Sequence, residues 1–177
     1  MKFLIITLLF CTTVYSVEDN FVKEAKELAS ELKMSLMKNL SEKITQEGVV
    51  EAVPFCHANV KSIAKKAAQK KVELYEFGRT SHKVRNRENS PQPWAEEYLK
   101  EFAGRQKGDI KKDYIVHKLG GKRIFMEPLY VEAKCLLCHG ENVSNNVKDK
   151  VQELYPQDKA TGFKLGEFRG FIWVKEK

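Results

Sequence analysis

The segment Cys135-Leu-Leu-Cys138-His139 constrains this chain more than any other feature. Two thiols three positions apart, followed at once by a histidine, form the motif for covalent attachment of haem c. The thiols add to the two vinyl groups of the porphyrin, and the histidine becomes an axial ligand of the iron. The motif therefore predicts a fold in which Cys135, Cys138 and His139 meet at one covalently bound haem c.

The N-terminus predicts export, which agrees with the assembly of haem c outside the cytoplasm. Met1-Lys2 is a short positive start, Phe3–Phe10 is an apolar run, and Val14-Tyr15-Ser16 suits a signal peptidase. We therefore expect a signal peptide over residues 1–16 and a soluble mature protein in the periplasm of a bacterium. The apolar run is shorter than the ~20 residues that a membrane-spanning helix needs. Lipid attachment at Cys11 is a weaker alternative, because the bulky residue before it disfavours that chemistry.

Length and charge limit the choice of architecture and partners. Cleavage after Ser16 leaves 161 of the 177 residues, enough for a single domain over residues 17–177. The formal net charge is +7, and the basic residues are spread along the chain. Nucleic acid is a poor partner for an exported protein, so we expect a solvated basic surface with a few cations for haem propionates or an acidic redox partner. The oligomeric state stays open.

The spacing of apolar residues predicts an α+β fold, in which helices are followed by mostly antiparallel strands. Predicted helices cover about residues 19–46, 50–67, 94–102 and 143–154, where apolar residues recur every three or four positions. Predicted strands cover residues 72–77, 114–119, 122–131 and 168–174. Gly48 should end the first helix, Pro54 should kink or restart the second, and Gly120-Gly121 should form a tight hairpin turn.

Cys56 is the thiol that the haem motif does not explain. Cys11 leaves with the predicted signal peptide, and haem takes Cys135 and Cys138, so Cys56 has no partner for a disulfide within the chain. A lone thiol in an oxidising compartment is buried, paired between chains or bound to a metal. Cys56 lies on the apolar stripe of the second helix, so we expect it to face the core.

The axial ligand opposite His139 is open on spacing alone. The candidates are Cys56, His57, His82, His117, Met34, Met37, Met126 and water. Histidine and methionine are the usual ligands of electron-carrying cytochromes. Met34, Met37 and His57 fall away from the apolar stripes, and His82 lies in a basic turn. His117 and Met126 occupy predicted strands and stay open, while Cys56 combines an apolar position with a soft ligand atom.

Two other chemistries compete for the cysteine pair. A thiol oxidoreductase also uses two cysteines three apart, with His139 lowering a thiol pKa, but the βαβ context of such a motif is missing. A structural zinc site needs a second ligand pair, and none is spaced suitably. A peroxidase needs an open iron face and a distal acid–base group, a role that His57 fills only if Cys56 does not bind.

Several segments carry a resemblance to a known family. They are the helix with Cys56 and residues 78–86, 91–94, 135–140, 155–160 and 166–170, which together span most of the mature chain. The chain resembles a family of exported c-type haem domains of largely undefined function, found as stand-alone periplasmic proteins and as extracytoplasmic sensor regions of signalling proteins. The resemblance implies a PAS-like fold, with N-terminal helices packed on a mostly antiparallel sheet, and His139 and Cys56 as the axial ligands. Arg87 departs from the pattern, because the family usually has proline there.

Two functions follow from these expectations. A haem-based redox or small-gas sensor needs an exchangeable ligand, and a thiolate that is lost on reduction supplies one. An electron carrier instead needs stable coordination in both oxidation states. The thiolate favours the sensor, whereas the absence of a fused output domain favours the carrier. Arg79, Lys83, Arg85 and Arg169 lie in the family-like segments and are candidate contacts to the haem propionates.

Overall fold

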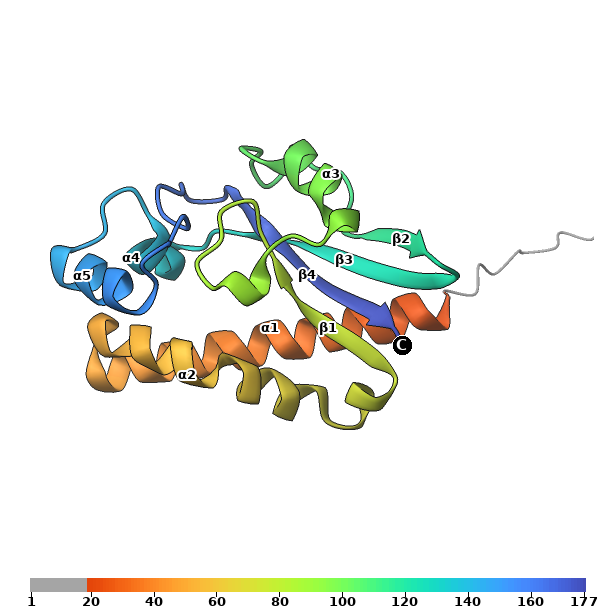
Figure 1. Cartoon of the computed structure of the whole chain (residues 1–177), viewed down its shortest axis with the longest axis horizontal. Helices are drawn as coiled ribbons and strands as arrows, with labels where there is room; N and C mark the ends of the chain where they lie inside the picture. Colours follow the sequence, from red (N-terminus) through yellow and green to blue (C-terminus); the bar gives the residue numbers. More distant parts are fainter. Residues whose placement is uncertain (1–18) are drawn as a thin grey trace, which may run out of the picture.

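A four-stranded antiparallel sheet with helices on both faces forms the framework of the protein (Figure 1). The computed structural model describes residues 19–177, so the predicted signal peptide and the lipoprotein alternative at Cys11 lie outside the described residues. The strands are β1 (Tyr75–Thr80), β2 (Ile115–Leu119), β3 (Lys122–Tyr130) and β4 (Phe168–Glu176), in the order β1-β4-β3-β2. The predicted α+β class is confirmed, whereas the PAS-like assignment stays a prediction.

The helices lie on different sides of this sheet. They are α1 (Asn20–Glu47), α2 (Val49–Ala68), α3 (Pro93–Phe102), α4 (Leu136–His139) and α5 (Asn145–Leu154). Short 3-10 turns occupy Gln69–Glu73, Arg87–Asn89 and Ala133–Cys135. The α1–α2 pair runs along one face, α3 covers the other, and α4 with α5 lies at one end (Figure 1). No helix within residues 19–177 is long and apolar enough to cross a membrane.

The central strands β3 and β4 build two cores, because successive side chains point to opposite faces of a sheet. Phe125 packs with the buried residues of α1, whereas Ile124 and Met126 pack with those of α3. All three are 0% exposed. The alternation therefore fixes which strand residues face α1.

The long helix α1 begins and ends where the sequence predicts. The Asp19 carboxylate caps it by accepting a hydrogen bond from the Phe21 amide at 3.0 Å. Gly48 ends it with a positive φ of 89°, a conformation that glycine adopts without steric cost. The α2 helix then continues through Pro54 without restarting, so of the two predicted effects of Pro54 the restart is wrong and the kink stays a prediction. The neighbouring residues Ala52 and Val53 are buried and hold that turn in place.

The strand predicted at residues 72–77 is displaced in the structure. A 3-10 turn, Gln69–Glu73, takes up its first half, and β1 runs on to Thr80. Val72 is apolar because it packs against the core under α1, not because it belongs to a strand. The predicted strand stopped at residue 77 because glycine, here Gly78, is uncommon inside strands. Gly78 pairs with Trp173, whose ring occupies the space that a Cβ at position 78 would need.

Gly170 joins β4 to β1 at close range, and its replacement by alanine tests that packing. Its φ is +142°, and a Cβ there would collide with the carbonyl oxygen of Thr80 and the side chain of Ser81. We expect Gly170→Ala to lower the free energy of unfolding by about 3 kcal/mol or more in urea titrations. Gly104 is the matched control, because its φ is +76° but a Cβ there meets nothing within 4 Å. Gly104→Ala should cost only about 1 kcal/mol, and equal losses for the two variants would contradict the packing argument.

Candidate functional site

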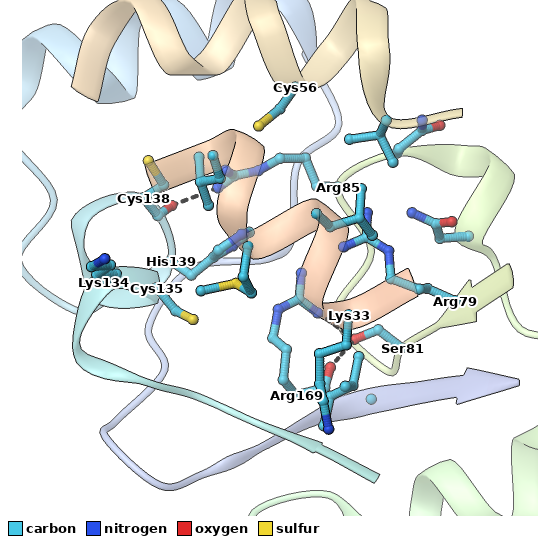
Figure 2. Close-up of a pocket in the computed structure, with 18 of the residues that line it drawn as sticks. Lys33, Cys56, Arg79, Ser81, Arg85, Lys134, Cys135, Cys138, His139 and Arg169 are labelled. Carbon is cyan, nitrogen blue, oxygen red and sulfur yellow. Dashed lines mark hydrogen bonds between the residues drawn. The ribbon is translucent and has the colours of Figure 1, made fainter. Parts of the chain in front are cut away.

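A cavity of about 270 Å³ lies at the end of the sheet where β1 and β3 finish and β4 begins. Side chains from α1, α2, β1, β4 and the cysteine motif form its walls (Figure 2). Every site residue predicted from the sequence lines it, namely Cys56, Arg79, Lys83, Arg85, Cys135, Cys138, His139 and Arg169. Cys56 and Arg169, which are 113 positions apart in the sequence, thus line the same cavity.

The cysteine motif forms a tight helical turn at one side of this cavity. Cys135 ends a 3-10 turn, and α4 carries Cys138 and His139. The Gly140 amide donates to the carbonyl of Leu136 at 3.1 Å, and a Cβ at position 140 would come within 2.7 Å of that oxygen. The turn therefore needs a glycine directly after the histidine.

His139 is oriented by a backbone carbonyl. Its Nδ1 lies 2.6 Å from the carbonyl oxygen of Ala160, and a carbonyl only accepts, so Nδ1 carries the proton and donates. Burial holds the pKa of His139 well below its usual value, and the cations Arg169 and Arg85 act in the same direction. The ring is therefore a neutral imidazole with Nε2 free to bind a metal, the arrangement that metal-ligating histidines adopt.

Cys56 faces the cavity from α2, on another wall than His139 (Figure 2). The expectation that it faces the core is wrong in detail, because its side chain is only half-buried and lines the cavity instead. Burial raises the pKa of the Cys56 thiol, while Arg79 and Arg85 oppose that shift. A soft sulfur atom thus lies near two cations, which only partly offset the effect of burial on its pKa.

Among the alternative ligands considered from the sequence, Met37 lines the cavity and the others do not. Met34 is 60% exposed, and Met126 is buried in the core under α3. His57 packs edge-on against Tyr155, His82 stacks on Phe168, and His117 lies within hydrogen-bond distance of the Tyr98 hydroxyl. Tertiary packing therefore reduces the side-chain candidates at this cavity to Cys56 and Met37, and water stays the other alternative.

The Arg85 guanidinium is already paired. Its Nε and Nη2 donate to the two Asp158 carboxylate oxygens at 3.1 and 2.9 Å, and Nη2 also donates to the carbonyl of Cys138 at 2.7 Å. Lys83 has weaker partners, since its Nζ lies 3.3 Å from the Thr161 carbonyl oxygen and above the Phe163 ring. The structure thus gives Arg85 protein partners, and its propionate contact stays a prediction.

Arg79 and Arg169 line the same cavity without an acidic partner in the part of the chain that the structure describes. Arg169 donates to the Ser81 hydroxyl at 2.7 Å and to the carbonyl of Lys83 at 3.2 Å, both neutral acceptors. Burial, with Arg79 close by, lowers the pKa of Arg169 to about 10, and burial also lowers the pKa of Arg79. Neighbouring guanidinium groups that lack counter-ions repel each other and favour an anion between them.

Sequence reasoning missed two parts of this site. One is the apolar wall that α1 contributes through Leu36, Met37, Leu40 and Ile44. The sequence did contain a signal for this wall. The apolar stripe of the first predicted helix is longer than any predicted strand, so part of it has no sheet to pack against. The other is the Ala160 carbonyl that orients His139. It had no signal, because every residue has such a carbonyl.

Comparison with known proteins gives one family and one fold. The sequence model of the Tll0287-like family matches residues 13–176. The crystal structure of the cyanobacterial heme-protein Tll0287 superposes with a TM-score of 0.54 at 20% identity, covering 88% of this chain and 88% of that chain. At that identity the likeness shows a shared fold. No curated protein matches the sequence.

The contrast between paired and unpaired arginines can be measured on the haem-free chain. Arg79→Met removes a guanidinium that has no counter-ion, so we expect the free energy of unfolding to rise by about 1 kcal/mol. Arg85→Met is the matched control, because it leaves the buried Asp158 carboxylate unpaired and should cost about 3 kcal/mol or more. The measurement is urea unfolding of wild type and of the two variants. A loss of stability in both variants would contradict the assignment of Arg79 as unpaired.

Proposed function

Because this chain belongs to the Tll0287-like family, we propose that it is a bacterial periplasmic protein with one covalently attached haem c in a single domain. One observation carries the proposal. The two cysteines and the histidine of the attachment motif, the thiol of Cys56 and two unpaired guanidinium groups all line one cavity. The cyanobacterial relative with this fold is itself a heme-protein.

The residues of the cavity fit a haem in three respects. Its walls include aliphatic side chains from α1 and α2, which suit the apolar face of a porphyrin. Arg79 and Arg169 supply the positive charge that two propionates require, with Lys83 nearby. His139 presents a free Nε2 on an imidazole whose other nitrogen is held by Ala160.

We assign His139 and Cys56 as the axial ligands, as the family resemblance implies. Bound haem supplies a one-electron redox couple and an iron coordination position. Cys56 offers an anionic sulfur that stabilises the ferric state, so the reduction potential should be low. Burial raises the pKa of the Cys56 thiol, Arg79 and Arg85 partly offset that rise, and coordination to iron would favour the thiolate further. Met37, on the neighbouring α1, is the alternative ligand.

The role that we favour is redox or small-gas sensing. Cys56 would hold a reduced iron less strongly than a ferric one, and protonation of its thiolate would then leave a coordination position for a small gas such as CO or NO. Cys56 lies on α2, which packs through Val53 against Val143, Val147 and Val151 of the α5 region. A movement of Cys56 can therefore pass through α2 to α5 at the surface.

Electron transfer is the second candidate, and one observation favours it. Leu137, between the two attachment cysteines, is 42% exposed, so a redox partner can approach the attachment turn closely. A thiol–disulfide oxidoreductase is less well supported, because burial raises the pKa of the Cys138 thiol and so disfavours the nucleophilic thiolate.

Covalent attachment can be tested by mass spectrometry of the chain exported from cells that assemble haem c. We expect one added haem on wild type, because Cys135 and Cys138 each form a thioether bond. Cys135→Ala and Cys138→Ala should each show an altered pyridine haemochrome spectrum, since one vinyl group stays free. Cys56→Ala is the matched control and should keep both thioether bonds. A wild-type mass without haem would refute the proposed function.

Axial ligation and the sensing role can be read from optical spectra of the oxidised and reduced protein. Cys56→Ala should lose the thiolate-ligated ferric spectrum, whereas Met37→Leu should leave it unchanged. Reduced wild type should bind CO, because Cys56 is released on reduction. Six-coordinate bands that CO does not change would favour the electron carrier, and a spectral change in Met37→Leu alone would assign Met37 as the ligand.

A further inference from the structure

Arg85 and Asp158 connect the two segments that hold His139 from either side. Arg85 donates to the carbonyl of Cys138, the residue before His139, at 2.7 Å. The same guanidinium binds Asp158 through both carboxylate oxygens. The ion pair is well buried, with side-chain exposures of 13% for Arg85 and 7% for Asp158. A planar guanidinium with a fixed fork of donors thus spans the attachment turn and the segment that follows α5.

Asp158 in turn fixes the residue that accepts the histidine proton. Its Oδ1 accepts from the amide of Ala160 at 2.9 Å, and the carbonyl of Ala160 accepts from His139 Nδ1 at 2.6 Å. Backbone bonds support this arrangement, because the amide of Phe163 donates to the His139 carbonyl and the amide of Lys159 donates to the Val84 carbonyl, at 3.0 and 2.9 Å. Ala160 is therefore fixed by the bond from its amide to Asp158, and its carbonyl in turn orients the His139 imidazole.

We propose that the Arg85–Asp158 pair is a positioning device for His139, which sets the direction and strength of the Nδ1–H···O bond to Ala160. The inference rests on the proposed haem function and deepens it. It also gives Arg85 a task different from the propionate contact expected from the sequence. Figure 2 shows the Arg85 side chain reaching toward Cys138, away from Arg169.

The consequence for haem chemistry follows from the hydrogen bond to Nδ1. A short bond from Nδ1 to a carbonyl makes the imidazole a stronger donor to the iron and so stabilises the ferric state. Loosening Ala160 lengthens that bond, weakens the donor and raises the reduction potential. Arg85 and Asp158 thereby tune the potential through the residue that they position.

The test uses the full-length haem-loaded protein with Asp158→Asn and Arg85→Lys. Asparagine keeps an oxygen for the Ala160 amide but loses the charge and one bond to Arg85, while lysine keeps the charge but loses the fork. Both variants should raise the midpoint potential, and the exchange of the His139 Nδ1 proton, followed by nitrogen-15 NMR, should become about tenfold faster. Asp158→Asn replaces one oxygen by an NH₂ group, so the potential and the proton exchange can still be measured on this variant if Arg85→Lys folds poorly.

A second ion pair far from the cavity supplies the control. Arg123 pairs with Glu176 and Asp19 near the opposite end of the sheet. Arg123→Lys should lower stability a little but leave the potential and the His139 proton exchange unchanged. If Asp158→Asn lowers stability but leaves both the potential and the His139 proton exchange unchanged, the Arg85–Asp158 pair only stabilises the fold and the proposal is wrong. The proton exchange is measurable whether or not haem is attached, so a failure of the proposed function is distinguishable from a failure of this inference.

Discussion

The packing of one long helix on a shorter sheet is the constraint on which the rest of the structure depends. α1 has 28 residues and is about 42 Å long, whereas β3 and β4 have 9 residues each and span about 30 Å. The first half of α1 is buried against the sheet, through residues from Phe21 to Leu32. Its second half extends past the end of the sheet (Figure 1), where its apolar residues Leu36, Met37, Leu40 and Ile44 face the cavity. That overhang, with α2 beside it, forms the apolar wall of the cavity.

The arginines that line the same cavity are of two kinds, one with an acidic partner within residues 19–177 and two without. Arg85 is paired with Asp158 and also donates to the carbonyl of Cys138, so it stabilises the turn that carries Cys138 and His139. Arg79 and Arg169 are partly buried on the cavity wall without acidic partners among the described residues, an arrangement that an anion entering the cavity would stabilise. The distinction between the two kinds of arginine is invisible in the sequence, because all three lie in polar loops or strand ends. It depends on a carboxylate that is 73 positions from Arg85.

Local patterns predicted most of the elements. The period of α1, the helix of residues 145–154, the Gly120-Gly121 hairpin and the last strand all lie within a few residues of their predicted positions. The error at β1 arose because Gly78 looks unlike a strand residue until Trp173 of the neighbouring strand is placed over it. Cys56 was assigned to the core for a similar reason. An apolar stripe identifies the inward face of a helix, but it does not distinguish a packed core from the wall of a cavity.

By itself, the sequence determined the α+β class and the set of residues that meet at the site, and it predicted the attachment chemistry, because each depends on side-chain identity and short-range spacing. Only the tertiary structure decided which arginines have partners, which alternative ligands reach the cavity and what holds His139. Those outcomes depend on contacts between distant segments. The bond from His139 to the carbonyl of Ala160 is the clearest case, since a backbone acceptor has no sequence signature and acts only where the fold places it.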